Sequence, residues 1–147
     1  MFIIRADTAL LPDGWQDNVY VHINSLGKID RVTTSLESGK PETHVSHLLP
    51  APVNVHSHAF QRAMAGLTEH RGSNGGDSFW TWRELMFRFL DQLTPDDIEA
   101  IAAFVQMEML EAGYATNVEF HYLHHAPDGN AYDNRVEMAE RIMAATE

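Results

Sequence analysis

From Leu48 onward, short strand-like runs alternate with long helical patterns, and this order constrains the fold more than any other feature of the sequence. A strand pattern over 48–58 precedes two helical patterns, a strand pattern over 115–122 and a last helical pattern that begins at Asn134. Strands that alternate with helices of this length form parallel βα units, because a parallel crossover needs about a dozen residues or more. We therefore predict an α/β fold with a parallel sheet.

The first 48 residues predict a separate, smaller unit made of strands. Val19, Val21 and Ile23 alternate with polar side chains, which is the period-two pattern of a half-buried strand. Turn residues at 25–28 and an apolar run over 29–32 predict a hairpin, and the polar segment 35–43 predicts a loop. We therefore divide the chain into a small β unit, residues 1–48, and a βα part, residues 49–147.

Capping residues predict where the helices begin and end. Ser78 and Thr94 can each cap a helix, and Pro95 follows Thr94 at the favoured first helical position. Gly113 is a suitable end for the second helix. The glycine-rich segment 70–77 predicts a loop, which is not a phosphate cradle because no Gly-Lys-Ser/Thr follows it.

The composition excludes several classes of protein. The 147 residues contain 10 Lys and Arg against 21 Asp and Glu, a net charge of −11, which argues against a nucleic-acid or anionic-membrane binder. The absence of cysteine excludes disulfides and thiolate metal sites. The chain has no signal-peptide pattern and no apolar run near about 18 residues, so we expect a cytoplasmic protein that does not span a membrane.

Two histidines, His56 and His58, form the clearest candidate metal site. Strand alternation predicts that both imidazoles share a face with Asn54, opposite Val55 and Ser57. A chance pair among the nine histidines is the alternative interpretation. A catalytic zinc ion usually has three protein ligands and a water molecule, so the remaining ligands would lie outside this chain.

Other polar residues leave two interpretations open. His121, His124 and His125 could be ligands or solvated loop residues, and the strand alternation places Glu119 and His121 on the inward face. Arg83, in the aromatic start of a predicted helix, could be a surface charge or a guanidinium that binds a carboxylate with both its arms.

Several stretches resemble the formimidoylglutamate deiminase family of the amidohydrolase superfamily. Leu49-Pro50-Ala51, four residues and then His56-Ser57-His58 resemble the first barrel strand of that superfamily, with Ala51 in place of the usual glycine. The stretches 56–67, 77–86, 108–114 and 119–125 resemble the deiminase family itself. The resemblance runs from about Leu48 to the end, and the preceding β unit suits the family. Asn117 departs from it, because related sequences tend to have a small or apolar residue there.

The resemblance implies the N-terminal part of a (β/α)8 barrel, incomplete here, preceded by a small β unit of the amidohydrolase type. It implies one zinc ion and hydrolysis of the formimino C=N bond of N-formimino-L-glutamate by a metal-bound hydroxide, giving N-formyl-L-glutamate and ammonia in histidine degradation. His56 and His58 match two zinc ligands, and Gln61, Arg83 and Tyr122 match positions that line the substrate site. The catalytic proton-transfer residues of the family lie beyond residue 147.

A complete barrel takes about 250 residues, so we expect this chain to be an N-terminal fragment that is inactive by itself. The full-length protein would act on a small molecule and could form a homodimer. Two alternatives remain: another deaminase or hydrolase of the same superfamily with a different substrate, or a truncated chain without catalytic activity.

Overall fold

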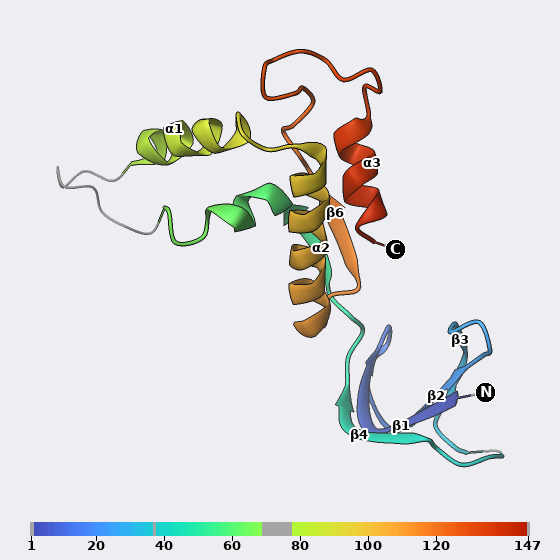
Figure 1. Cartoon of the computed structure of the whole chain (residues 1–147). Helices are drawn as coiled ribbons and strands as arrows, with labels where there is room; N and C mark the ends of the chain where they lie inside the picture. The colour runs from blue at the N-terminus through green and yellow to red at the C-terminus, as the bar shows by residue number, and fades with distance from the viewer. Residues whose placement is uncertain (1, 37, 69–77, 147) are drawn as a thin grey trace. The chain divides into compact units, whose positions relative to one another are not determined.

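The computed structural model describes residues 2–36, 38–68 and 78–146 (Figure 1). The chain divides into two compact units, Met1–Ala51 and Pro52–Glu147. The predicted glycine-rich loop over 70–77 lies outside the described residues. Among the described residues, no helix combines the length and the apolar character that crossing a membrane requires.

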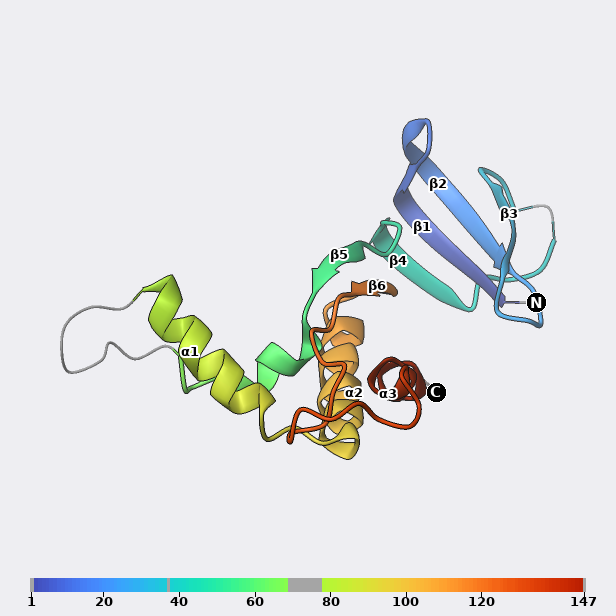
Figure 2. The same cartoon turned by 90° about the horizontal axis from the view of Figure 1, so that it is seen from above.

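The first unit is a four-stranded sheet with the strand order β3-β2-β1-β4 (Figure 2). Its strands are β1 (Phe2–Leu11), β2 (Gly14–Ile23), β3 (Ile29–Thr33) and β4 (Thr43–Leu48). The pairs β1–β2 and β2–β3 are antiparallel, whereas β4 runs parallel to β1. Buried alanine and valine side chains form its core: Ala6, Ala9, Val19 and Val21.

Two features of this sheet differ from the sequence prediction. Strand β1 extends to Leu11, well beyond its initial apolar run. Strand β4 lies partly in the segment predicted as a loop, and it carries His44 and His47. It is an edge strand with no buried residue, so its sequence lacks the apolar alternation from which a strand is predicted.

The second unit contains two parallel strands, β5 (Val53–Ser57) and β6 (Thr116–Glu119). The parallel pairing across a helical crossover confirms the predicted βα organisation, although β6 is shorter than predicted. One face of this pair is apolar and open, with Val53, Val55 and Val118 at least half exposed. Such a face is typical of a barrel strand pair whose remaining strands are absent.

The helices of this unit are η1 (Ala59–Met64), α1 (Phe79–Leu90), α2 (Pro95–Glu111) and α3 (Glu137–Ala144). Ser78 and Thr94 cap α1 and α2 as predicted, and Gly113, with a φ of 89°, follows the end of α2. The short 3₁₀ helix η1 was not predicted from the sequence. Helix α3 begins at Glu137 rather than at Asn134, whose side-chain oxygen accepts the backbone N–H of Val136, the residue just before the helix.

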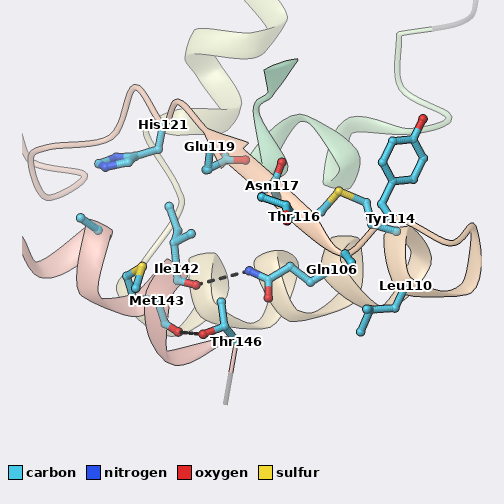
Figure 3. A pocket seen from close by; sticks show the side chains of 13 residues that line it. Gln106, Leu110, Tyr114, Thr116, Asn117, Glu119, His121, Ile142, Met143 and Thr146 are labelled. Atoms are coloured by element: carbon cyan, nitrogen blue, oxygen red, sulfur yellow. Dashed lines mark hydrogen bonds between the residues drawn. The ribbon is translucent and has the colours of Figure 1, made fainter. Parts of the chain in front are cut away.

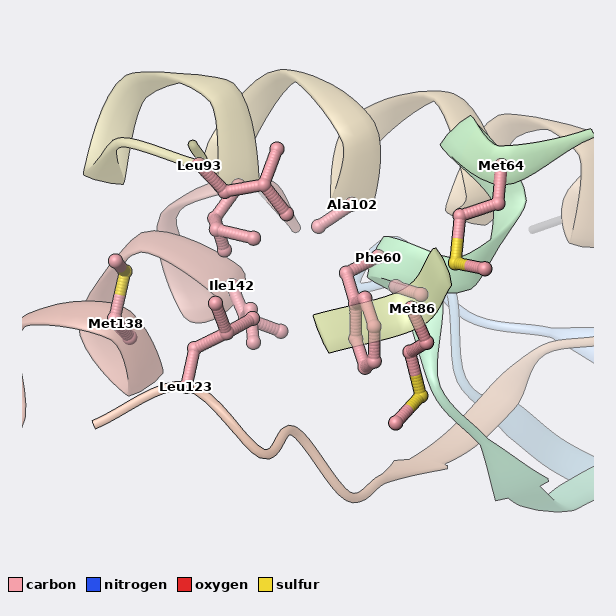
Figure 4. Close-up of a cluster of buried hydrophobic side chains, with 10 residues drawn as sticks. Phe60, Met64, Met86, Leu93, Ala102, Leu123, Met138 and Ile142 are labelled. Atoms are coloured by element: carbon pink, nitrogen blue, oxygen red, sulfur yellow. The ribbon is translucent and has the colours of Figure 1, made fainter. Parts of the chain in front are cut away.

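A hydrophobic core joins η1 to the three α-helices (Figure 4). Leu123, from the segment after β6, also packs into it. The buried side chains include three methionines, whose flexibility suits an irregular junction of helices. The buried members are Ala59, Phe60, Met64, Met86, Leu93, Ile98, Ala102, Leu123, Met138 and Ile142.

One arginine connects α3 to α2 at their polar edge. The Nη1 atom of Arg141 lies 2.9 Å from Glu99 Oε2 and 3.1 Å from Asp96 Oδ1. Its Nε atom donates to Glu137 Oε1 at 2.9 Å. Hydrogen bonds to Glu99 and Glu137 hold the pKa of Arg141 above its usual range. The two helices are therefore joined by apolar burial on one side and by this ion-pair network on the other.

The reciprocal cap of α2 gives a testable prediction. The Thr94 hydroxyl accepts from the Asp97 backbone N–H, and Asp97 Oδ2 accepts the Thr94 N–H at 2.9 Å. Thr94→Ala should lower the free energy of unfolding by about 1 kcal/mol, because it leaves a helix N–H without its acceptor. Denaturant unfolding of the protein measures this change, with Thr94→Ser as the control that keeps the hydroxyl.

The same cap should depend on pH. Hydrogen bonds from the Thr94 side chain and backbone lower the pKa of Asp97, so its carboxylate stabilises the fold above the unfolded-state pKa of about 3.9. That stabilisation is lost as the pH falls through the lowered folded-state pKa. The difference between wild type and Thr94→Ala should therefore shrink at acid pH. A difference that stays constant down to the acid transition would contradict this role of the cap.

Candidate functional site

An extra residue in β5 determines which way its side chains point. Val53 and Asn54 pair with Thr116 and Asn117, but the next pair is Ser57 with Glu119. Strand β5 thus advances three residues while β6 advances two, as in a β-bulge. Such bulges turn a side chain to the opposite face. The sequence prediction had placed the side chains of the two histidines on the same face as that of Asn54. In the structure they leave that face, although the Asn54 Oδ1 atom still accepts the backbone N–H of His56 at 3.2 Å.

The residues on the helix-covered face of β5 are Asn54 and Ser57. The Asn54 amide lies 3.3 Å from the sulfur of Met109 in α2, and Ser57 is 8% exposed. The prediction that Ser57 shares a face with Val55 is therefore wrong, because simple alternation does not continue through the bulge.

The two imidazoles converge at the carboxyl end of β5. Their Nε2 atoms lie 3.0 Å apart, and their ring centroids lie 4.8 Å apart. The Nδ1 atom of His58 lies 2.7 Å from the carbonyl oxygen of Phe120. A carbonyl oxygen only accepts, so Nδ1 of His58 carries the proton and its Nε2 presents a lone pair to His56. This tautomer is the one that binds a metal ion through Nε2.

The histidine pair fits two ligands of one zinc ion. Two nitrogens bound to zinc at about 2.0–2.1 Å each are separated by roughly 2.8–3.4 Å for bond angles between a right angle and tetrahedral. The observed separation of 3.0 Å lies in that range. Among the described residues, no group of three or more His, Cys, Asp or Glu side chains could hold a metal ion. The described residues therefore include this pair of imidazoles, with a spacing that suits zinc, but no complete ligand set.

Aromatic side chains after β6 line one side of His58. The Phe120 ring centroid lies 5.9 Å from that of His58, and the Tyr122 centroid lies 5.0 Å from it. The Tyr122 hydroxyl lies 3.4 Å from His58 Nε2. The structure therefore brings Tyr122, although it follows the end of β6, to the same place as the histidine pair.

Gln61 and Arg83 are carried by the helical segments that follow β5. Gln61 lies in η1, and its side-chain nitrogen lies 3.9 Å from the sulfur of Met86 in α1. Arg83 lies in the first turns of α1, exposed, with its guanidinium 4.5 Å above the centre of the Phe87 ring. Among the described residues, no salt bridge or side-chain hydrogen bond joins Arg83 to the histidine pair.

An ion pair fixes η1 against α2. The Nε and Nη2 atoms of Arg62 donate to the two carboxylate oxygens of Glu108 at 2.8 and 2.9 Å. Hydrogen bonding by Arg62 lowers the pKa of Glu108. The 3₁₀ helix that continues from His58 is thereby attached to the long helix behind the strands.

A cleft of about 490 Å³ lies between β6, α2 and α3 (Figure 3). Glu119 and His121 line it together with Gln106 of α2 and Ile142 of α3. The sequence prediction placed Glu119 and His121 on the inward strand face. The structure places both on the helix side instead, where they line the cleft with residues of α2 and α3, whereas Val118 on the other face of β6 is exposed.

Two oxygen atoms at this cleft lack hydrogen-bond partners within the described residues. They are Oδ1 of Asn117 and Oε2 of Glu119, and both are buried. The other oxygen of Glu119, Oε1, accepts the backbone N–H of Ala59 at 2.7 Å. Glu119 therefore extends from the cleft to the residue that follows His58.

The other histidines of this region are separate from the pair. The Nδ1 atom of His121 lies 2.9 Å from the Leu123 carbonyl oxygen, and its ring centroid lies 4.9 Å from that of His124. His125 forms an isolated bridge with Ala131. Within the described residues, these three histidines do not form a group able to hold a metal ion.

Sequence reasoning did not find the groups that orient the histidines. The Phe120 carbonyl is a backbone atom, so no side-chain pattern marks it. Glu119 was noted only as a strand residue, and its contact with Ala59 depends on the shifted register of β5 and β6. Only the pairing register of the two strands would have revealed the contact between Glu119 and Ala59.

Comparisons with known proteins found a similar sequence across nearly the whole chain and a family model that matches its first part. Residues 1–42 match the family described as formimidoylglutamate deiminase HutF, N-terminal domain. The chain is 47% identical over 145 residues to a formimidoylglutamate deiminase from Pseudomonas aeruginosa, across 99% of this chain and 32% of that protein. The chain thus spans about a third of the length of this relative.

Solved structures share the fold. An amidohydrolase from Brucella melitensis superposes with a TM-score of 0.88 at 46% identity, over 99% of this chain and 32% of that one. An atrazine chlorohydrolase from Arthrobacter aurescens, solved in complex with zinc, gives a TM-score of 0.75 at 18% identity, over 99% and 33%. These neighbours confirm the predicted fold class, the incomplete N-terminal part of a barrel preceded by a small β unit.

The hydrogen bonds of two histidines predict opposite tautomers. In protein treated with a chelator near pH 8, the His58 proton should be on Nδ1, since this atom donates to the Phe120 carbonyl. His44 is the internal control: its Nε2 lies 2.7 Å from Asp7 Oδ1, so its proton should be on Nε2. Long-range ¹⁵N–¹H correlation spectra of histidine-labelled protein distinguish the two forms. A proton on Nε2 of His58 would refute the proposed orientation of its lone pair.

Proposed function

Because this chain is a relative of formimidoylglutamate deiminase within the amidohydrolase superfamily, we propose that the full-length protein is a zinc-dependent deiminase. Its reaction is the hydrolysis of the formimino C=N bond of N-formimino-L-glutamate, which consumes one water molecule and gives N-formyl-L-glutamate and ammonia. The observation that carries this proposal is the convergence of the His56 and His58 Nε2 atoms within a chain so similar to that enzyme.

In this proposal, His56 and His58 hold the metal ion from the carboxyl end of β5. A bound zinc ion would supply a Lewis acid and lower the pKa of a water molecule to about 7. His58 is already in the tautomer that such binding needs, because its Nδ1 atom donates to the Phe120 carbonyl. No proton has to be moved within the ring before His58 can act as a ligand.

We assign Gln61, Arg83 and Tyr122 to substrate binding. The Tyr122 hydroxyl, 3.4 Å from His58 Nε2, can donate or accept a hydrogen bond beside the metal ligands. The exposed guanidinium of Arg83 can bind one carboxylate of the substrate through two parallel hydrogen bonds. Its cation–π contact with Phe87 presents that guanidinium over a flat apolar surface, which limits its motion.

In this proposal, the two units of the chain belong to different structural parts of the enzyme. Residues 1–48 form the small β unit of the enzyme, and residues 49–147 form the first βα units of its barrel. The ligands beyond His56 and His58, and the groups that transfer protons, belong to the remaining part of the barrel. In this proposal, the full-length protein acts in histidine degradation.

Replacement of either histidine tests the metal assignment. His56→Ala and His58→Ala in the full-length protein should each abolish zinc binding and ammonia release from N-formimino-L-glutamate, since two ligands are too few to hold a catalytic zinc ion. The matched control is His44→Ala, which removes an exposed histidine from the other unit. Metal analysis and an ammonia assay measure the two effects. Variants that retain both zinc and turnover would disprove the assignment.

Replacement of Arg83 tests substrate recognition. Arg83→Lys keeps the charge but removes the planar fork, so kcat/KM should fall by the equivalent of about 1–3 kcal/mol. Arg88→Lys, in the same helix, is the matched control and should leave kcat/KM unchanged. An unchanged kcat/KM for Arg83→Lys would show that Arg83 does not contact the substrate. Turnover of a different substrate in preference to N-formimino-L-glutamate would favour another specificity within the superfamily.

A further inference from the structure

Three hydrogen bonds attach the His58 segment to the end of β6. The Phe120 N–H donates to the Ser57 carbonyl at 2.9 Å, and the Phe120 carbonyl accepts from His58 Nδ1 at 2.7 Å. The third bond joins the Ala59 N–H to Oε1 of Glu119, also at 2.7 Å. Two consecutive residues, Glu119 and Phe120, thus bond the ring of His58 and the backbone of the residues on either side of it.

The bond to Glu119 is the one of the three that depends on a side chain of β6. Ala59 is the first residue of η1, and His58, at the N-cap, makes no side-chain cap bond. Ala59 is buried, with 7% of its surface exposed, so its N–H depends on an acceptor supplied by the protein. The Glu119 carboxylate fills this role from 60 residues away in the sequence.

We propose that Glu119 is a positioning residue for the histidine pair. By accepting the Ala59 N–H, it fixes the backbone immediately after His58, and this keeps the His58 Nε2 atom 3.0 Å from that of His56. This inference rests on the proposed metal-binding function of the pair. Glu119 itself lies on the cleft side of β6 and acts on the metal only through the backbone of residues 57–59.

The required chemical property is an acceptor oxygen rather than a negative charge. A backbone N–H can donate either to a carboxylate oxygen or to the carbonyl oxygen of an amide. Glutamine at position 119 can therefore keep the bond to Ala59, whereas alanine removes it. A purely electrostatic effect of Glu119 on a bound cation would instead be lost in both variants, which separates the two explanations.

The test measures zinc affinity of the full-length protein by competition with a coloured chelator. Glu119→Ala should bind zinc about 10–100-fold more weakly than wild type, the range for loss of a group that orients a ligand. Glu119→Gln should stay within about threefold of wild type, because its amide oxygen can still accept the Ala59 N–H. Glu111→Ala, at the exposed end of α2, is the matched control. Circular dichroism verifies the fold, and Glu119→Leu replaces the alanine variant if that one does not fold.

The outcomes separate this inference from the proposed function. If wild type fails to bind zinc, or if His56→Ala binds it as wild type does, the metal assignment itself is wrong. If those two proteins behave as expected but Glu119→Ala binds zinc as tightly as wild type, the positioning role is wrong and the metal site stands. Equal weakening in Glu119→Gln and Glu119→Ala would also overturn the inference, because charge would then be the determining property.

Discussion

The parallel pairing of β5 with β6, with its one extra residue in β5, is the constraint on which the rest of the second unit depends. Without that residue, His56 would lie on the face covered by α2, where Asn54 contacts Met109. With it, both histidines leave the helix-covered face and meet at their Nε2 atoms. A single irregularity in register therefore places both imidazoles together, away from the face of β5 that the helices cover.

The helices hold this strand pair from behind. Helix η1 continues directly from His58 into the core formed with the three α-helices, and Arg62 attaches it to Glu108 of α2. On the opposite face, Val53, Val55 and Val118 are exposed to solvent. Burial of apolar surface contributes roughly 25 cal/mol per square ångström. Packing of further barrel strands against this face would therefore stabilise the fold. The unit is thus asymmetric, with a packed back and an open front.

The sequence was sufficient to predict the elements defined by local chemistry. The caps at Ser78 and Thr94, the end of α2 at Gly113 and the parallel βα order all follow from near neighbours in the chain. It was insufficient where a long-range contact decides the structure. Edge strand β4 has no buried residue to reveal it, and the faces of Ser57, Glu119 and His121 depend on a pairing 62 residues apart. The two histidines were recognisable from their spacing, whereas the Phe120 carbonyl that orients His58 was not.

The distance in sequence between His58 and Phe120 has a consequence for how the protein is made. The two histidines are synthesised almost together, but the carbonyl group that orients His58 follows only after 62 more residues. At about 5–20 residues per second, that delay is roughly 3–12 s. During this interval the imidazoles belong to a nascent chain in which helix caps can form but the strand pair cannot. A nascent chain therefore exposes both imidazoles before the carbonyl group that orients His58 has been synthesised.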